Sequence, residues 1–449
     1  MFKKILPFVV ACFVAHSVFA QNETGPALMP GLLQNAKINP AQLPAERFVI
    51  GVPGVFGSYS HNVGGVGDIL REEDDSTIAI RSDVLLKNLD EENTLRLHLE
   101  LETFRAAFRL NENLAFSLHH AARSVNYLRY PETLPKLFLQ GNSQYIGQDV
   151  AFGPDQHTFA YNEIGLGAAF TFGKLSIGVN GKALLGIGDV SVTNSDLTLY
   201  TDPDIYQLTL STDYQINTAT FDEVLFFDSL SGFGEEYGWD EIFQFENFQT
   251  GNTGFAFDVG LTYQISDRLQ VGASVLDIGK INWRKDVINY NSKGESTFEG
   301  LDLKGALTGD SVSISSAIDT VENIFSFEKT EESYSTDLPA RYYLNANYKV
   351  SDKLTVAATY NGESYRDQLF HAYGIGGSYA LNKNLSFGAS YNVRNDSYFN
   401  IGLSLITRLG PVQFYAMTDN IAVAFQPYDS NNVNARVGLN FVFGKDKEE

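Results

Sequence analysis

The stretch "LRLHLELETFRAAFRL", residues 95–110, decides the fold of this chain. Leucines at 95, 97, 99 and 101 alternate with Arg96, His98, Glu100 and Glu102. Strict alternation predicts a β-strand, because successive side chains of a strand point to opposite faces. After Glu102 the apolar phase slips by one residue, to Phe104, Ala106, Phe108 and Leu110, which predicts a β-bulge near Glu102 and Thr103.

This strand fits two surroundings. In a soluble sandwich the leucines would face a dry core and the charged residues would face water. In an outer-membrane barrel the leucines would face lipid and the charged residues would line a wet lumen. The strand alone does not choose between them, so the rest of the chain has to decide.

The N-terminus predicts export. "MFKKILPFVVACFVAHSVFA" has two lysines, an apolar run and a small-residue site ending at Ala20, the pattern of a cleavable signal peptide. A membrane anchor helix is the alternative, but the run is short and Pro7 and His16 interrupt it. Cys12 is the only cysteine, and it would leave with the signal. The mature chain would then have no disulfide, thiol nucleophile or cysteine metal site.

Charge and hydropathy narrow the class of protein further. The formal net charge is −22, and it becomes −24 when Lys3 and Lys4 leave with the signal. So acidic an exported protein is a poor binder of nucleic acid. Beyond the signal no apolar run is long enough for a transmembrane helix. A membrane location therefore requires a closed β-barrel.

The spacing of turns predicts fourteen strands. Alternating strands are joined by short turns at 111–113, 173–174, 266–268, 350–353, 382–384 and 410–411. The connections between these hairpins vary in length and are often long, at 130–157, 191–253, 281–339, 363–370 and 395–397, and the stretch 421–432 separates the last hairpin from the final strand. Such sidedness is typical of outer-membrane barrels, with turns in the periplasm and loops outside. Six hairpins, an opening strand near 47–60 and a final strand near 433–443 give fourteen strands. The leucines of 95–101 would then face lipid.

Several longer motifs place the chain in a family. It resembles an uncharacterised family of Bacteroidota outer-membrane β-barrels, a domain of unknown function related to the FadL-type long-chain fatty-acid transporters. The motifs are "INPAQLPAERFVIGVPG" (38–54), "NSDLTLYTDPD" (194–204), "ASVLDIGKINWRKDVINY" (273–290), "FEGLDL" (298–303), "GPVQFYAMTDN" (410–420) and the closing "VNARVGLNFVFG". Asn39, Pro40 and Ala41 also resemble the N-terminal hatch of FadL-type barrels.

The resemblance implies fourteen strands and an N-terminal segment folded into the lumen, but no established substrate. The expected organisation is a signal peptide at 1–20, a periplasmic or hatch segment at 21–46, a barrel at 47–444 and a charged tail at 445–449. The long acidic loops depart from a simple fatty-acid transporter. The expected location is the outer membrane of a Gram-negative cell.

The alternation predicts a charged row on the lumen face of the opening strand: Arg96, His98, Glu100, Arg105 and Arg109. These residues either contact a ligand or the hatch, or form a ladder of structural ion pairs. We favour the ladder, since unpaired buried charges are costly. His119 and His120 are adjacent and would point to opposite faces, so they cannot share one metal ion. Asp202, Asp204 and residues 72–75 lack the spacing of a calcium loop. We therefore expect no metal site and no cofactor.

The stretch 221–248 is the least ordinary part of the sequence. It combines many aromatic residues with acidic ones, and it either packs on itself or grips an apolar ligand or a protein partner. The candidate contacts are Phe226, Phe227, Phe233, Trp239, Phe243 and Phe245. Residues 131–140 predict a short amphipathic helix in another outer loop, which could belong to the same lid.

These observations favour a FadL-like, porin-like channel for small apolar or amphipathic molecules. The alternative is a docking barrel without transport activity in surface protein export, similar to barrels of the type IX secretion system. The expected partners are outer-membrane lipid and either a small hydrophobic ligand or a secretion-system protein, with no nucleic acid. There is no G-x-S-x-G motif and no serine–histidine pairing, so the sequence predicts no enzyme.

Overall fold

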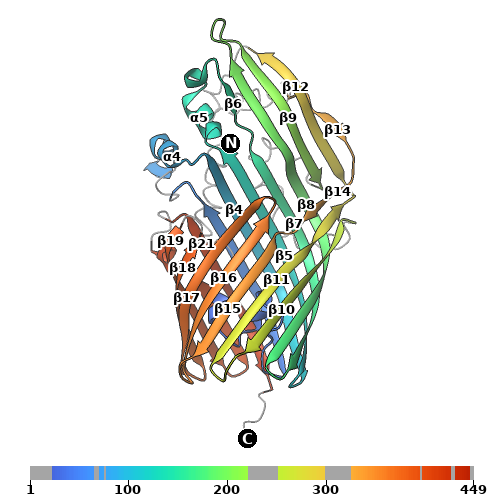
Figure 1. Cartoon of the computed structure of the whole chain (residues 1–449), viewed down its shortest axis with the longest axis vertical. Coiled ribbons are helices and arrows are strands. Elements are labelled where there is room, and N and C mark those ends of the chain that lie inside the picture. The colour runs from blue at the N-terminus through green and yellow to red at the C-terminus, as the bar shows by residue number, and fades with distance from the viewer. Residues whose placement is uncertain are drawn as a thin grey trace.

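The computed structural model describes residues 23–64, 70–74, 77–220, 251–298, 325–394, 397–425 and 430–444. Fourteen antiparallel strands close into one barrel, because β1 pairs with both β4 and β21. The barrel strands are β1 (Phe48–His61), β4 (Glu92–Asn111), β5 (Leu114–Pro131), β7 (Asp155–Phe172), β8 (Leu175–Thr201), β10 (Thr253–Gln264), β11 (Leu269–Trp283), β15 (Ala340–Lys349), β16 (Leu354–Tyr365), β17 (Gln368–Asn382), β18 (Leu385–Arg394), β19 (Ser397–Leu409), β20 (Val412–Thr418) and β21 (Asn432–Phe443). Figure 1 shows the barrel with a narrower projection above it.

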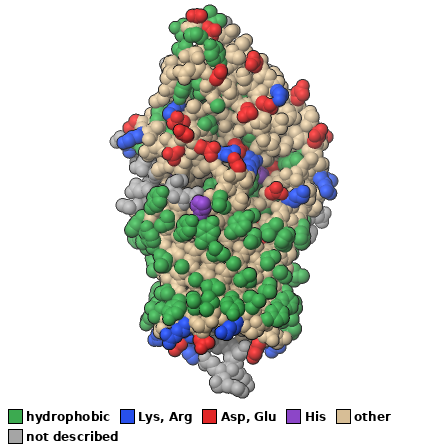
Figure 2. Space-filling view, viewed as in Figure 1, with side chains coloured by type: hydrophobic (Ala, Val, Ile, Leu, Met, Phe, Trp, Pro, Cys, Tyr) green, Lys and Arg blue, Asp and Glu red, His purple; other side chains and the backbone are tan. Residues whose placement is uncertain are grey.

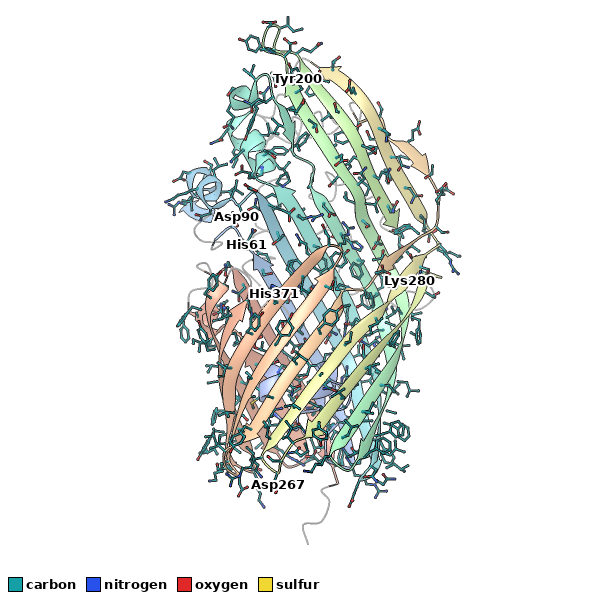
Figure 3. All side chains as sticks on the ribbon, viewed as in Figure 1. His61, Asp90, Tyr200, Asp267, Lys280 and His371 are labelled. Atoms are coloured by element: carbon teal, nitrogen blue, oxygen red, sulfur yellow. The ribbon has the colours of Figure 1, made fainter. Side chains whose placement is uncertain are left out.

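The expected hairpins are confirmed. Short turns join β4 to β5, β7 to β8, β10 to β11, β15 to β16, β17 to β18 and β19 to β20. All of these turns lie at one end of the barrel, which we call the turn end; we call the opposite end the loop end. Asp267 marks the turn end in Figure 3. Gly173 and Gly410 take positive φ values of 60° and 61° in two of these turns, a conformation that glycine adopts without strain.

The outer surface carries an apolar belt. In β10 every second residue from Phe255 to Tyr263 is exposed and large, while Ala256, Asp258, Gly260 and Thr262 between them are buried. On the face drawn in Figure 2 this green belt crosses the lower half of the molecule, with charged side chains below and above it. Alternation of this kind puts one face of each strand against lipid and the other into the lumen.

The opening strand β4 has the predicted bulge. Its register with β5 shifts between Glu102 and Phe104, which confirms the interpretation of the phase slip. Leu95, Leu97, Leu99 and Leu101 alternate with the inward residues but are only half exposed. Between Leu99 and Asn111 the strand climbs roughly 30 Å along the barrel axis, given ~3.4 Å per residue and ~40° of tilt. Since such a belt is about 25 Å tall, Leu99 lies at its upper border, and Phe108 and Leu110 carry the exposed part.

The long connections contain more β-structure than the sequence predicts. β8 continues to Thr201, well past the barrel, and pairs there with β6 (Asp149–Ala151) and β9 (Leu208–Ala219). β9 pairs in turn with β12 (Val287–Phe298), and β12 with β13 (Glu328–Thr330). These strands form the extension, the projection in Figure 1. β14 (Tyr334–Asp337) adds a short partner to β11. The connectors 191–253 and 281–339 are therefore sheet in part, not only loop.

The remaining elements are short. The predicted helix in 131–140 is present as α5 (Thr133–Gln140), next to α4 (Ser82–Asn88). Two strands, β2 (Leu70–Asp74) and β3 (Thr77–Ile80), form a separate hairpin, and η2 (Ser143–Tyr145) and η4 (Ile421–Ala424) are single 3-10 turns. None of the helices in the described ranges has the length and apolar character that a membrane crossing requires. The predicted signal peptide and the aromatic stretch 221–248 with its six candidate contacts lie outside the described residues.

Candidate functional site: the lumen and mouth of the barrel

The N-terminal segment fills the lumen. Residues 23–46, here the hatch, form a short helix α2 (Gly25–Leu28) and a 3-10 helix η1 (Leu33–Lys37), and both are buried. Met29 and Leu32 pack against Tyr415 and Met417 of β20. Leu33 packs against apolar residues of β1, β4 and β21 near the turn end. A fourteen-stranded barrel is too wide for its own wall side chains to fill, so this hatch supplies the missing core.

The Asn39-Pro40-Ala41 motif sits on a patch of wall glycines. Asn39 is 1% exposed, and its Nδ2 donates to the carbonyls of Leu261 and Ala273 at 3.0 and 3.3 Å. A Cβ on Gly178 would lie 2.2 Å from the Ala41 nitrogen, and one on Gly260 would lie 2.2 Å from Asn39 Oδ1. Only glycine leaves room for the motif at these wall positions. The motif is thus the part of the hatch that fits against strands β8, β10 and β11.

Polar contacts fix the hatch to the wall. Lys37 Nζ lies 2.7 Å from Glu100 Oε1 and 2.8 Å from Glu102 Oε2, both on β4. Glu23 accepts two hydrogen bonds from Arg436 of β21. Gln34 and Asn440 exchange two hydrogen bonds of 3.1 Å. These contacts are specific, and water could replace each of them.

Thr24 extends the set of contacts near the N-terminus. Its backbone N–H donates to Asp419 Oδ2 at 3.0 Å, and its hydroxyl donates to Asp419 Oδ1 at 2.5 Å. Asp419 also pairs with Arg394. The start of the hatch is therefore joined to the ends of β18 and β20.

The ion pairs of the hatch continue across the lumen as one network. Arg123 lies 3.3 Å from Glu100, 3.0 Å from Glu163 and 3.5 Å from Asp277, and so connects the hatch side to the opposite wall. Lys182 pairs with Asp258 at 2.9 Å and with Asp277. The cations of the network are Lys37, Arg105, Arg123, Lys182, Arg341 and Arg436, and the carboxylates are Glu23, Glu100, Glu102, Glu163, Asp258 and Asp277. The charges in this set balance, as burial requires.

The structure places all five predicted lumen residues inside the barrel, but in different roles. Glu100 and Arg105 belong to the ionic network. Arg96 pairs with Glu363 near the loop end, and His98 Nε2 lies 3.1 Å from the Tyr127 hydroxyl. Arg109 donates to the carbonyls of Leu43 and Pro44, where the hatch leaves the lumen: its Nη2 lies 3.2 Å and 2.8 Å from them.

The sequence did not single out most of the network. Glu163, Lys182, Asp258, Asp277 and Arg341 were not among the candidates. One pattern in the sequence could have identified such residues. It is a single ionisable residue on the inward face of a strand whose other inward residues are small or polar. Lys182 is an example, since it follows Gly178 and Asn180 on the buried inner face of β8.

An aromatic layer follows the ionic one toward the loop end. Tyr127 lies beyond Arg123 on β5, and Phe159 and Tyr161 lie beyond Glu163 on β7. Trp283 at the end of β11 is fully buried, and its Nε1 donates to Thr336 Oγ1 at 2.9 Å. These residues share one buried apolar cluster with Tyr365 and Phe370. The lumen therefore has two layers of different chemistry above the hatch.

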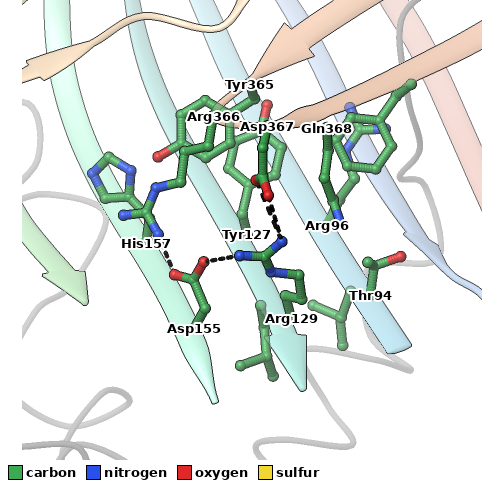
Figure 4. A pocket seen from close by; sticks show the side chains of 13 residues that line it. Thr94, Arg96, Tyr127, Arg129, Asp155, His157, Tyr365, Arg366, Asp367 and Gln368 are labelled. Carbon is green, nitrogen blue, oxygen red and sulfur yellow. Dashed lines mark hydrogen bonds and ion pairs between the residues drawn. The ribbon is translucent and has the colours of Figure 1, made fainter. Parts of the chain in front are cut away.

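The β16–β17 hairpin closes the mouth, the opening at the loop end. Figure 4 shows its turn, Arg366 and Asp367, reaching across to β5 and β7. Asp155 accepts from Arg366 and from Arg129 Nη2, the latter at 2.9 Å, and Arg129 Nη1 lies 3.3 Å from Asp367. Tyr365 of the hairpin stacks on Tyr127. We name these four ionic residues the clasp; Arg366 has a φ of 51°, which the hairpin turn imposes.

His119, His120 and Asp202 each contact a protein partner. His119 Nε2 lies 3.1 Å from Glu163 inside the lumen, whereas His120 contacts Thr103 Oγ1 at 2.7 Å, so the two point apart as expected. Asp202 Oδ1 accepts from the backbone of Asp204 and Ile205 at 2.8 and 3.0 Å and so closes its own turn. The described residues contain no cluster of three or more metal-ligating side chains.

Comparison with known proteins identifies a family. A model described as a family of unknown function, DUF5723, matches residues 40–419. The chain belongs to this family. No curated protein matches it.

Three solved structures similar to this chain share little of its sequence. The toluene transporter TbuX of Ralstonia pickettii has a TM-score of 0.45 at 11% identity, covering 96% of this chain and 97% of its own. A FadL homologue of Pseudomonas aeruginosa has a TM-score of 0.43 at 11% identity, with coverages of 93% and 94%. The toluene transporter TodX of Pseudomonas putida has a TM-score of 0.42 at 9% identity, with coverages of 94% and 97%.

Proposed function

We propose that this protein is an outer-membrane channel for small amphipathic molecules, closed by its own hatch. The location is supported by the apolar belt, whose height along strands such as β10 suits a bilayer. The short turns then face the periplasm, and the extension and the clasp face the outside. The signal peptide expected at 1–20 would supply the route across the inner membrane.

The observation that carries the proposal is the manner in which the lumen is filled. The hatch is bound to the wall by ion pairs and hydrogen bonds at Glu23, Thr24, Gln34 and Lys37, each of which water could replace. The wall behind it is lined by small and polar side chains, including Asn345, Thr359, Asn361 and Asn392. Withdrawal of the hatch would therefore leave a wall that water wets.

The order of the layers favours amphipathic molecules. A solute entering from outside meets the aromatic layer around Tyr127 and Phe159 and then the ionic layer around Arg123 and Glu163. A purely apolar solute would lose favourable contacts in the ionic layer. A highly charged solute would lose them in the aromatic layer. A molecule with both kinds of surface suits this sequence of environments.

A disulfide lock tests the proposal. A Cβ at Gly25 would lie 3.3 Å from the Cβ of Met417, close to the ~3.8 Å of a disulfide. The chain from Gln21 onward has no cysteine, so Gly25→Cys/Met417→Cys forms a single defined link. In liposomes we expect oxidised protein to block the uptake of small amphipathic solutes and reductant to restore it.

Controls separate this effect from damage to the barrel. The single variant Gly25→Cys should behave the same with and without reductant. A chain that lacks residues 21–46 should be open in both conditions. Equal uptake by the locked and reduced forms, or no uptake by the chain without its hatch, would contradict the channel.

One feature favours a second candidate, a docking barrel in surface protein export. At the tip of the extension Ile205 and Tyr206 are 69% and 64% exposed, on a turn ordered by Asp202. A pair of large exposed side chains on an ordered turn suits contact with a protein. Here Ile205→Ser/Tyr206→Ser should abolish a complex isolated on native gels and leave solute uptake unchanged.

A further inference from the structure

The mouth contains a small pocket beside the clasp. Its walls come from the loop ends of six barrel strands or the residues that adjoin them: β1, β4, β17, β18, β19 and β21. His61, Arg96, Arg394, Ser397 and Asn432 contribute its polar groups, and Phe370 part of its apolar wall. Figure 3 labels His61 near this end of the barrel. The pocket thus lies on the outer side of the hatch and the ionic layer.

The lining is rich in hydrogen-bond donors and contains no carboxylate among the described residues. Arg96 and Arg394 are 4% and 1% exposed. Their counter-ions, Glu363 and Asp419, are not part of the pocket lining. The two guanidinium groups are therefore held in place by partners that lie outside the pocket.

Two of the donors have no hydrogen-bond partner among the residues that the structure describes. Arg96 Nε is buried and makes no hydrogen bond, although Nη2 of the same side chain binds Glu363. His61 Nε2 is also buried and unpaired. Buried polar groups of proteins are nearly always hydrogen-bonded, so two unpartnered donors on residues that line one pocket indicate a site for an acceptor.

The protonation state of His61 makes its Nε2 a hydrogen-bond donor. The backbone N–H of Val63 donates to His61 Nδ1 at 3.3 Å, so the neutral ring carries its proton on Nε2. Burial lowers the pKa of His61 to about 4, which keeps the ring neutral in ordinary conditions. An acceptor in the pocket would therefore meet an N–H at this position.

Phe370 fixes the orientation of Arg96. The guanidinium carbon lies 3.8 Å from the centroid of the Phe370 ring, and 5.4 Å from that of Tyr127. The cation–π contact with Phe370, together with the ion pair to Glu363, holds the guanidinium in place. The Nε–H donor is thus preorganised and needs little rearrangement to bind an acceptor.

We propose that this pocket binds the oxyanion of a small hydrophilic solute: a phosphate, sulfate or carboxylate group. Guanidinium, imidazole N–H, amide and hydroxyl donors are the groups that recognise such oxygens. The pocket opens into the mouth, and its volume of about 20 Å³ takes one or two ligand oxygens. The rest of the solute would extend from the pocket into the mouth.

The site does not depend on whether the hatch moves. Binding is therefore measured on the protein locked by Gly25→Cys/Met417→Cys, which keeps the test separate from the test of transport. Inorganic phosphate is titrated into the purified locked protein in uncharged detergent and followed by calorimetry, with sulfate and acetate as further oxyanions. Glucose serves as a neutral molecule with many acceptors. We expect saturable binding of oxyanions and at least tenfold weaker binding of glucose.

Paired variants assign the binding to this pocket. Arg96→Gln/Glu363→Gln removes the donor and its counter-ion together, so that no buried charge is left alone. His61→Phe keeps a ring and removes the N–H. Each should weaken phosphate binding at least tenfold. The control Arg129→Gln/Asp155→Asn removes a neighbouring, less buried ion pair of the clasp, whose residues do not line this pocket, and should change binding less than twofold.

Four results would overturn the proposal: no saturable oxyanion binding, glucose binding as tight as that of phosphate, unchanged affinity in His61→Phe, or an equal loss in the control. A fifth concerns the source of the oxyanion. If vesicles of anionic phospholipid displace phosphate from the locked protein, the ligand is a lipid head group and the assignment to a hydrophilic solute is wrong.

Discussion

The rings of Tyr127 and Tyr365 stack across the mouth of the barrel, with centroids 4.1 Å apart and planes inclined by 17°. Tyr127 belongs to the wall strand β5, and Tyr365 ends β16, which belongs to another part of the wall. The contact shows that an outer hairpin folds inward over the lumen. The mouth is closed by this hairpin, and the turn end is closed by the hatch.

The clasp should make this closure sensitive to salt. Asp155→Asn removes the carboxylate that pairs with both Arg129 and Arg366. Half-exposed pairs contribute about 1 kcal/mol together, or about fivefold in the population of the open hairpin. Trypsin should therefore cut after Arg366 about fivefold faster in the variant.

Salt and a matched variant test whether the ion pairs of the clasp protect Arg366 from trypsin. High salt should speed cleavage of the wild-type protein and have little effect on Asp155→Asn. Asp213→Asn breaks the exposed pair with Lys293 on the extension and should leave cleavage after Arg366 unchanged. If high salt speeds cleavage equally in all three proteins, ionic contacts do not hold the hairpin.

The glycine patch should be essential for seating the hatch. Gly178→Val would place its Cβ about where the Pro40 carbonyl and the Ala41 nitrogen lie. We expect the barrel to form and the hatch to be displaced, so that protease removes residues before Arg47. Gly181→Val on the same strand is the control, because its nearest neighbour is Phe255 Cζ at 3.6 Å. A protected hatch in Gly178→Val would show that Asn39-Pro40-Ala41 can seat elsewhere.

Lys37 should be a major determinant of stability. Lys37→Met leaves Glu100 and Glu102 facing one another without the shared ammonium, and loss of one member of a buried ion pair costs about 3–5 kcal/mol. Unfolding by urea in detergent measures this loss. Lys37→Met/Glu102→Gln should recover part of the stability, since Glu100 keeps Arg123 and Arg436. A double variant less stable than Lys37→Met would contradict the electrostatic explanation.

The loss of stability caused by an arginine on the outer face should depend on its depth in the apolar belt. Val259 lies in the middle of the exposed row of β10. Val259→Arg should lower the free energy of unfolding in liposomes by about 2–4 kcal/mol. Leu99→Arg should cost about 1 kcal/mol or less, because Leu99 lies at the upper border where the guanidinium reaches water. Equal costs at the two positions would place the belt higher on the barrel.

His61 should make stability depend on pH. Its pKa is about 4 in the folded protein, below the ordinary 6.5, so the unfolded chain binds the extra proton between these values. Stability then falls as pH drops from 6.5 to 4, by up to about 3 kcal/mol from this group. The difference between wild type and His61→Phe in urea midpoints at pH 7 and pH 4.5 isolates the contribution. Parallel shifts in the two proteins would show that His61 is already protonated in the folded state.

The sequence predicted the wall of the barrel well because apolar and polar residues alternate within each strand, so each strand can be recognised from its own residues. Turn residues at 111–113 or 410–411 and the phase slip at Glu102 are local signals, and the structure confirms them. The continuation of β8 to Thr201 was not predicted, because its outer half pairs with β9 and has no lipid face to give a simple pattern.

The interior was less predictable, because its contacts join residues far apart in the chain. Lys182 and Asp277 each look like a single charged residue in a polar face, and only closure of the barrel brings them together. The inward fold of Arg366 and Asp367 has no local signal at all. The connection 363–370 is short and polar, which describes a solvent-facing turn equally well.

The bond between Glu23 and Arg436 joins the beginning and the end of the described chain. A translocating polypeptide delivers Glu23 first and Arg436 almost last, and the seam between β1 and β21 closes only then. Long-range pairings of this kind slow folding, because the chain must close a large loop before it gains the contact. In the location proposed above, the chain would therefore reach the membrane before its barrel can close, and the arrival of the last strand would set the time of closure.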